Sequence, residues 1–173
     1  SVVAGTNIDE VVESIKQLNA QGIACTVDNL GEFVFEKEAA LAAKEQILAV
    51  IERIHLDNLD AHISLKPSQL GLDIDVDFCY ENLKEIVALA NDYQIFVNFD
   101  MENYARLHPS FDLLEQLNAD YGNVGTVIQA YFYESDDNIE RFKDYRLRLV
   151  KGAYKEDPSV AFQDKVDIDR KFI

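Results

Sequence analysis

The stretch Arg146-Leu-Arg-Leu-Val-Lys-Gly-Ala-Tyr-Lys-Glu156 joins an apolar strand pattern to a charged turn of small residues. Its leucines and valine favour a buried β-strand over residues 147–151. Arg148 and Lys151 place two cations where that strand ends, and a buried cation is costly unless it meets an opposite charge. Gly152 has no side chain, so the backbone there can approach a ligand closely. The stretch therefore indicates an anionic ligand at the C-terminal end of a strand.

The same alternation of a short apolar strand with an amphipathic helix recurs towards the N-terminus. We expect strands over residues 23–27, 61–66, 94–100, 124–130 and 147–151. We expect helices over residues 6–21, 36–53, 77–93, 110–120 and 136–145, and another that starts near Asp164. Thr6 is the expected N-cap of the first helix, and Gly22 is expected to end it. Repeated βα units of this kind predict a parallel sheet.

Two parallel architectures compete, an open doubly wound sheet and a (β/α)8 barrel of the TIM type. No G-x-G-x-x-G turn follows the first strand, which weakens the dinucleotide-binding open sheet. Polar side chains instead follow or end all of the expected strands, at the edge where barrel active sites are built. They are Asp28, Lys66, Asp100, Gln129 and Arg148. We therefore predict an α/β (β/α)8 barrel to which residues 1–173, as one domain incomplete at the C-terminus, supply about five βα units.

Composition restricts the class of partner. The 173 residues include 16 basic and 32 acidic ones, a net charge of −16 that repels nucleic acid and anionic membrane surfaces. No apolar run is long enough to span a membrane, and no signal peptide opens the chain. Cys25 and Cys79 lack a metal-ligand spacing and are expected to be buried thiols in a reducing compartment. We expect a cytoplasmic protein that binds no nucleic acid and makes at most peripheral membrane contact.

Five segments, taken in order, resemble the strand-end motifs of proline dehydrogenases. They are Thr26–Glu32, Ser64–Asp73, Asn98–Glu102, Val127–Tyr131 and Arg148–Tyr154. The resemblance implies FAD bound over the barrel mouth and oxidation of L-proline to Δ1-pyrroline-5-carboxylate by hydride transfer to flavin N5. This reaction is the first step of proline catabolism, and in the family the electrons pass to a quinone-type acceptor.

The resemblance also implies roles for individual residues. Lys66, which is expected to bind the proline carboxylate, joins Asp100 and Arg148 as a catalytic candidate. Asp100 is expected near both flavin and substrate, and Arg148 against the flavin near N5. Gln129 offers an amide to the edge of the flavin ring. Further cofactor contacts are expected from Lys151, Gly152 and Ala153, and Tyr154 is expected to line the substrate pocket.

Two other classes of function stay open. Asp100 and Glu102 are two carboxylates at strand-like spacing, as a metal-dependent lyase would use, although no histidine joins them and we expect no metal site. A second role for Glu102 is to hold neighbours or begin a helix. The family's barrel has eight βα units, so a non-catalytic partial barrel is the other alternative. Such an arc is expected to bind FAD weakly or not at all alone, and to self-associate through its exposed barrel edges.

Overall fold

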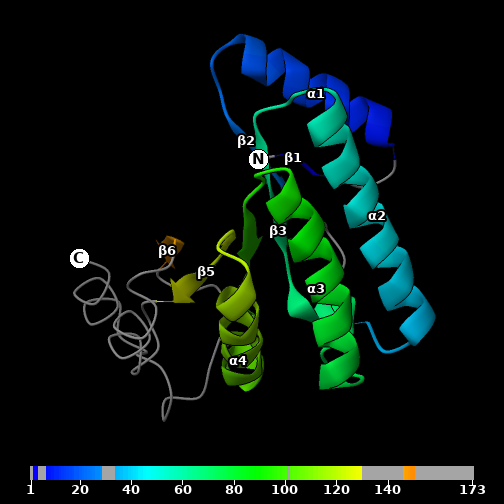
Figure 1. Cartoon of the computed structure of the whole chain (residues 1–173), viewed down its shortest axis with the longest axis vertical. Coiled ribbons are helices and arrows are strands. Elements are labelled where there is room, and N and C mark those ends of the chain that lie inside the picture. Colours follow the sequence, from blue (N-terminus) through cyan, green and yellow to red (C-terminus); the bar gives the residue numbers. More distant parts are fainter. Residues whose placement is uncertain (1, 4–6, 29–33, 101, 130–145, 151–173) are drawn as a thin grey trace.

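Parallel strands alternate with helices through the part of the chain that the structure describes (Figure 1). This computed structural model describes residues 2–3, 7–28, 34–100, 102–129 and 146–150. The strands are β1 (Val2–Val3), β2 (Cys25–Asp28), β3 (Ala61–Leu65), β4 (Val97–Phe99), β5 (Val124–Gln129) and β6 (Arg146–Val150). The helices are α1 (Ile8–Ala20), α2 (Lys37–Leu56), α3 (Val76–Asp92) and α4 (Tyr104–Asp120), with a short 3₁₀ helix η1 (Pro67–Leu70). The helices expected over residues 136–145 and near Asp164 lie outside the described residues.

All strand pairs in the described part are parallel, and the order in the sheet is β1-β2-β3-β4-β5-β6. A doubly wound sheet reverses its strand order at one point, whereas a barrel keeps neighbours in sequence order. The observed order is therefore the one that a barrel requires. The sequence analysis missed β1, in which Val2 pairs with Val27, because two residues are too few to show a period.

The first helix begins one residue later than expected. Asn7, not Thr6, is its N-cap, and the Asn7 side chain accepts a hydrogen bond from the Asp9 N–H at 2.9 Å. Asparagine caps a helix at least as well as threonine does, so the two candidates could not be separated by residue type. Gly22 follows the C-terminus with a φ of +78°, in agreement with the expected helix end.

The fourth helix corrects a larger error, because α4 begins at Tyr104 and not at residue 110. Pro109 was expected to lie outside the helix, but it lies inside. Proline removes one backbone hydrogen bond, and tertiary packing can offset that loss. Leu107, Phe111 and Leu114 recur at helical spacing on both sides of Pro109, and each is at most 1% exposed. Burial of this continuous apolar stripe keeps the helix intact.

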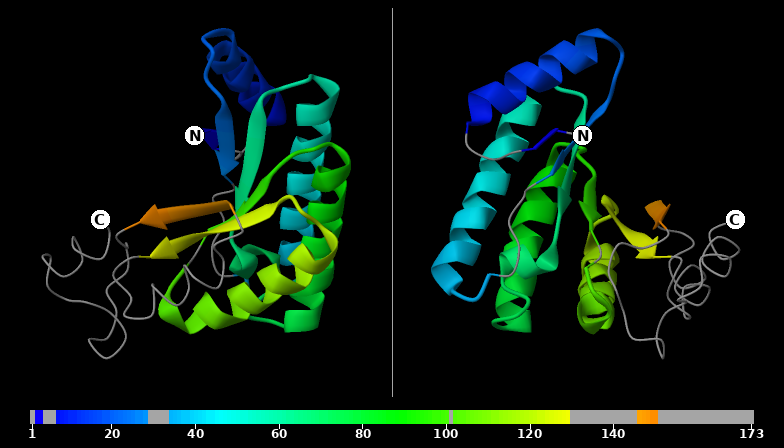
Figure 2. Two further views of the ribbon diagram at one scale, coloured as in Figure 1. Left: turned by 60° about the vertical axis from the view of Figure 1, so that its left-hand side comes forward. Right: turned by 180° about the vertical axis from the view of Figure 1, so that it is seen from behind.

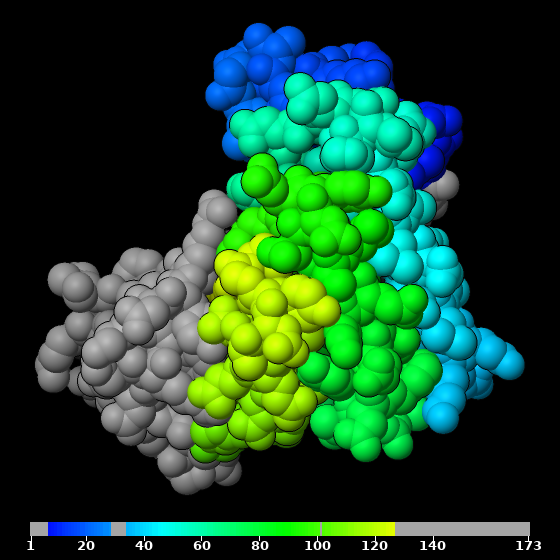
Figure 3. Space-filling model, in the orientation of Figure 1, coloured from blue at the N-terminus to red at the C-terminus, as the bar shows by residue number. Residues whose placement is uncertain are grey.

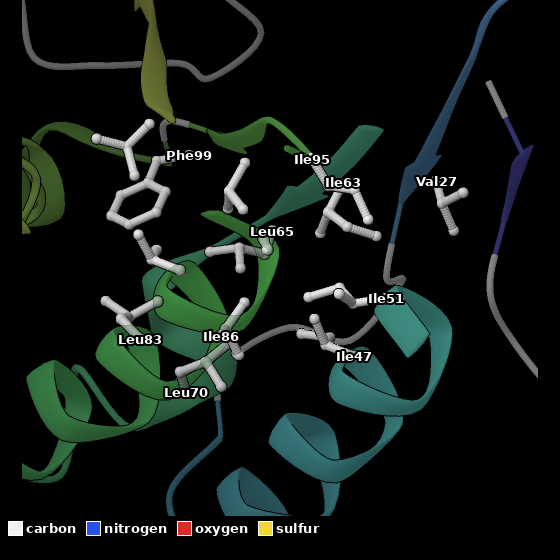
Figure 4. Close-up of a cluster of buried hydrophobic side chains, with 14 of the residues drawn as sticks. Val27, Ile47, Ile51, Ile63, Leu65, Leu70, Leu83, Ile86, Ile95 and Phe99 are labelled. Carbon is white, nitrogen blue, oxygen red and sulfur yellow. The ribbon is translucent and has the colours of Figure 1, made fainter. Parts of the chain in front are cut away.

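Helices α2, α3 and α4 lie beside one another against one face of the sheet, and α1 lies across the end of α2 (Figures 1 and 2). Their outer sides form one continuous surface in Figure 3. Figure 4 shows the core between helices and strands, where Ile47 and Ile51 of α2 and Ile86 of α3 lie near Ile63 and Leu65 of β3. Within the described ranges, no helix has both the length and the apolar character to cross a membrane.

Candidate active site at the C-terminal edge of the sheet

Lys66 and Asp100 occupy neighbouring positions where β3 and β4 end. Leu65 pairs with Phe99 in the parallel register, so the next residue on each strand is Lys66 and Asp100. The Asp100 N–H donates to the carbonyl oxygen of Leu65 at 2.7 Å, which continues the ladder one step beyond the strands. The predicted cation and the predicted carboxylate are thus adjacent at one edge of the sheet.

The register carries this row of residues on to β6. Phe99 pairs with Thr126, so Val127 of β5 stands beside Asp100. Val127 in turn pairs with Arg148. Lys66, Asp100 and Arg148 therefore lie in one row across the C-terminal edge, and we refer to these three residues as the charged row.

The other predicted site positions lie close to the charged row. Gln129 is the last residue of β5, two positions beyond Val127, and pairs with Val150. Asp28 is the last residue of β2, one residue beyond the expected strand end at residue 27, and it pairs with Ser64, two positions before Lys66. Lys151, Gly152, Ala153 and Tyr154 lie outside the described residues.

Two side chains hold the carboxylate of Asp100. The Ser64 hydroxyl donates to Asp100 Oδ2 at 2.7 Å, and the Asn98 amide donates to Oδ1 at 2.9 Å. The same Asn98 amide also donates to Ser64 Oγ at 3.1 Å. Because Ser64 is 1% exposed and Asn98 is 5% exposed, these bonds are shielded from competing water. The closed triangle fixes the orientation of the Asp100 carboxylate.

The backbone of Lys66 is held by a buried glutamine. The Lys66 N–H donates to Oε1 of Gln69 at 3.0 Å, and the Gln69 N–H donates to the Lys66 carbonyl at 2.9 Å. Gln69 is fully buried. Lys66 precedes Pro67 and has an extended backbone, which is the conformation that proline imposes on the residue before it.

Glu102 lies between β4 and α4 and is 3% exposed. Its carboxylate accepts a hydrogen bond from the Ser68 hydroxyl and another, at 3.3 Å, from the Ser68 N–H. Burial raises the pKa of Glu102, while the Ser68 hydrogen bonds and the positive charges of Arg106 and Lys66 oppose this rise. The site therefore contains a second carboxylate, which is hydrogen-bonded to Ser68 of η1.

The connection from β3 to α3 is held by contacts from two helices. The Asn82 amide of α3 donates to the carbonyl of Leu70 at 3.0 Å. Arg106 of α4 forms a salt bridge with Asp73, with Nη2 2.9 Å from Oδ2. Gly71 has a φ of +105°, and a Cβ added there would lie 2.7 Å from two ring carbons of Phe78. Only glycine fits this close approach.

The metal-lyase alternative gains no support from this geometry. Asp100 accepts hydrogen bonds from Ser64 and Asn98, whereas Glu102 accepts hydrogen bonds from Ser68. Across the described ranges, no three histidine, cysteine or acidic side chains gather as metal ligands. The histidines form ring contacts: His55 stacks on Tyr93 with centroids 3.7 Å apart, and His62 meets the Phe96 edge at 5.8 Å.

The sequence analysis did not single out the neutral residues of the site. Ser64, Asn98, Ser68 and Gln69 all hold a predicted charged residue or its neighbour. Ser64 and Asn98 each precede a predicted residue by two positions, which on a strand is the spacing of side chains on one face. That period was the available signal. Nothing in the sequence distinguishes Ser68 from an ordinary turn serine.

A family model described as proline dehydrogenase matches residues 11–166. "Proline dehydrogenase 2" of Bacillus subtilis strain 168 is 40% identical over 173 residues, covering 99% of this chain and 57% of that protein. "Proline dehydrogenase" of Deinococcus radiodurans is 32% identical over 177 residues, covering 98% of this chain and 57% of that protein. The chain thus spans 57% of the length of these curated relatives.

Among solved structures, the fold matches proline utilization A (PutA) from Bdellovibrio bacteriovorus, which was crystallised after inactivation by N-propargylglycine. The TM-score is 0.87 at 20% sequence identity, and the match covers 99% of this chain and 23% of that protein. This likeness shows a shared parallel α/β fold.

Proposed function

Because the chain belongs to the proline dehydrogenase family, we propose that the protein oxidises L-proline to Δ1-pyrroline-5-carboxylate, with FAD as cofactor. The observation that carries the proposal is the charged row. Lys66 and Asp100 follow the ends of neighbouring strands β3 and β4, and Arg148 of β6 stands in the same row beyond Val127 of β5. The C-terminal edge is where parallel α/β folds build their active sites. The family relationship supports the reaction, and the strand register supports the choice of residues.

The residues at this edge suit a flavin chemically. Arg148 supplies a permanent cation, and Gln129 supplies both a donor and an acceptor two positions beyond the Asp100 neighbour Val127. We propose that Gln129, Arg148 and Asp100 hold the ring, and that Lys151, Gly152 and Ala153 border the rest of the cofactor. When bound, FAD supplies the acceptor for the two electrons that proline loses.

Lys66 binds the substrate in this proposal. Its ammonium group is a compact positive charge, suited to the carboxylate of an amino acid. Pro67 and Gln69 fix the Lys66 backbone, so the side chain starts from a defined position. We propose that Tyr154 also contacts the substrate. Orientation by a fixed cation places the carbon that loses hydride in a constant position, and such positioning is a large part of catalytic power.

Asp100 supplies a fixed negative charge to the charged row in this proposal. Ser64 and Asn98 hold its two carboxylate oxygens, so its charge is fixed next to Lys66. A fixed charge needs no reorganisation when the charge of the substrate changes, and this is how preorganised sites lower barriers. We propose that Asp100 acts through hydrogen bonds to the bound molecules.

We propose further that the sheet is part of a (β/α)8 barrel. The sequential parallel order of the strands supports this. The buried thiols Cys25 and Cys79 and the acidic composition favour a cytoplasmic protein. We propose that the electrons pass to a quinone-type acceptor, which the protein reaches by peripheral membrane contact.

The test is an activity measurement on the protein at its natural full length. The protein is purified with FAD and given L-proline and an artificial electron-accepting dye. We expect a flavin absorbance spectrum and dye reduction that depends on L-proline, with D-proline as the matched control. A well-folded protein without bound flavin, or with no response to L-proline, would show that the proposal is wrong.

A further inference from the structure

Two serines on either side of Lys66 each bind a carboxylate at the end of β4. Ser64 precedes Lys66 by two residues and bonds to Asp100, whereas Ser68 follows Lys66 by two residues and bonds to Glu102. The segment Ser64–Ser68, which carries Lys66 at its centre, is therefore hydrogen-bonded at its first and last residues to the region that follows β4.

We propose that Ser68 and Glu102 are positioning residues that set the place of Lys66 for binding the substrate carboxylate. The inference rests on the proposed function, in which Lys66 binds L-proline, and extends it to a pair with no expected substrate contact.

The attachment is rigid enough to transmit a displacement. A single residue, Pro67, separates Ser68 from Lys66, and its ring fixes φ, which removes one backbone degree of freedom. Gln69 holds both the N–H and the carbonyl of Lys66. A shift of η1 after loss of the Ser68 contact therefore moves the Lys66 backbone with it.

The Ser68–Glu102 contact is also a strong one. Ser68 is fully buried and Glu102 is 3% exposed, so water does not replace a lost hydrogen bond there. The carboxylate receives both the hydroxyl and the N–H of Ser68. Lys66 and Arg106 both interact electrostatically with Glu102, so the carboxylate also attracts the cation that it positions.

The test uses the full-length protein with its cofactor and four variants. Ser68→Ala removes the hydroxyl and keeps the N–H, and Glu102→Ala removes the whole acceptor. Glu102→Gln keeps an oxygen for the Ser68 N–H and adds an amide that can donate to Ser68 Oγ. Ser110→Ala is the matched control, because Ser110 is also a buried serine, 2% exposed, but it belongs to α4 and not to the segment that carries Lys66.

Two quantities are measured for each folded variant. Steady-state kinetics give KM for L-proline and kcat separately. Calorimetry gives the dissociation constant for cyclopentanecarboxylate, which has the ring and the carboxylate but no amine to oxidise. We expect Ser68→Ala and Glu102→Ala to raise both KM and the dissociation constant by about tenfold or more, with kcat changed by less than about threefold. Glu102→Gln is expected to stay within about threefold of wild type in both.

Wild-type KM and wild-type affinity for cyclopentanecarboxylate in folded Ser68→Ala would overturn the inference, as would an equal change in Ser110→Ala. If Glu102→Ala fails to fold, Ser68→Ala decides alone. Failure of the proposed function looks different, because the wild-type protein itself would then show no oxidation of L-proline.

Discussion

The hydroxyl of Ser64 lies 2.7 Å from Oδ2 of Asp100, across two neighbouring strands. Together with the hydrogen bond from Asn98, this contact fixes the orientation of the Asp100 carboxylate. The Asp100 carboxylate is therefore held in one orientation beside Lys66, the residue that follows Leu65 on the neighbouring strand.

Replacement of Ser64 by alanine tests the role of this contact. A hydrogen bond to a charged group contributes about 1.5 to 3 kcal/mol, so we expect Ser64→Ala to lower kcat for L-proline by about tenfold or more. Ser110→Ala, also a buried serine, should leave kcat within about twofold. Steady-state kinetics on the full-length protein measure both, and equal kcat values for wild type and Ser64→Ala would contradict this role.

Glycine 71 should be intolerant of any side chain. Its φ is +105°, and a Cβ would meet the Phe78 ring at 2.7 Å. Gly22 also has a positive φ, of +78°, but a Cβ there meets no atom within 4 Å. We expect Gly22→Ala to lower the free energy of unfolding by about 1 to 2 kcal/mol from backbone strain alone, and Gly71→Ala to lower it by clearly more. Urea denaturation compares the two, and equal losses would contradict the steric account.

Protonation of Glu102 should make stability depend on pH in an unusual direction. Burial raises its pKa above the ordinary value of 4.5, so the folded protein binds more protons than the unfolded chain between these two values. The contribution of Glu102 to the free energy of unfolding is therefore complete below the ordinary value, and it falls as pH rises through the folded pKa.

Glutamine at position 102 does not titrate. The unfolding free energy of Glu102→Gln, relative to wild type, should therefore rise between about pH 4 and about pH 7. Urea denaturation at several pH values measures this difference. A flat or falling difference for Glu102→Gln would contradict the assignment.

Both thiols should be inert in the native protein. Burial raises the pKa of Cys79 to about 12, with the charges of Asp73 and Glu102 adding to the rise, and burial also raises the pKa of Cys25. Only the thiolate reacts quickly, so iodoacetamide at about pH 8 should label neither residue until urea is added. Mass spectrometry counts the added groups, and rapid labelling of Cys79 in the native protein would contradict its burial.

The parallel strand order and the charged row could be expected from sequence because both depend on short-range periodicity. Lys66 and Asp100 follow strand patterns that stop at known positions, and parallel strands bring their ends to one edge. The expected start of the fourth helix, residue 110, follows Pro109 directly, whereas the buried stripe of Leu107, Phe111 and Leu114 continues through the proline. Local proline chemistry is visible in a sequence, whereas the core that offsets it is not.

The partner of Glu102 was not predicted, for a related reason. Ser68 and Glu102 are 34 positions apart, and their contact exists only because η1 packs against the end of β4. A pairing of this kind depends on tertiary structure and leaves no local pattern. Lys66, Asp100 and Arg148 could be predicted because a charged residue at the end of a buried strand needs a partner. A serine at such a position gives no comparable indication.

The central claim is that Lys66 in the charged row binds the carboxylate of L-proline beside a flavin. Its most direct test is the anaerobic addition of L-proline to the FAD-loaded, full-length protein, with flavin absorbance followed in wild type and Lys66→Met. We expect the absorbance of wild type to bleach, and Lys66→Met to need about thirtyfold more L-proline for half-bleaching, since a hydrogen bond to a charged group contributes about 2 kcal/mol. An identical half-bleaching concentration in the two proteins, or no bleaching of wild type, would contradict the claim.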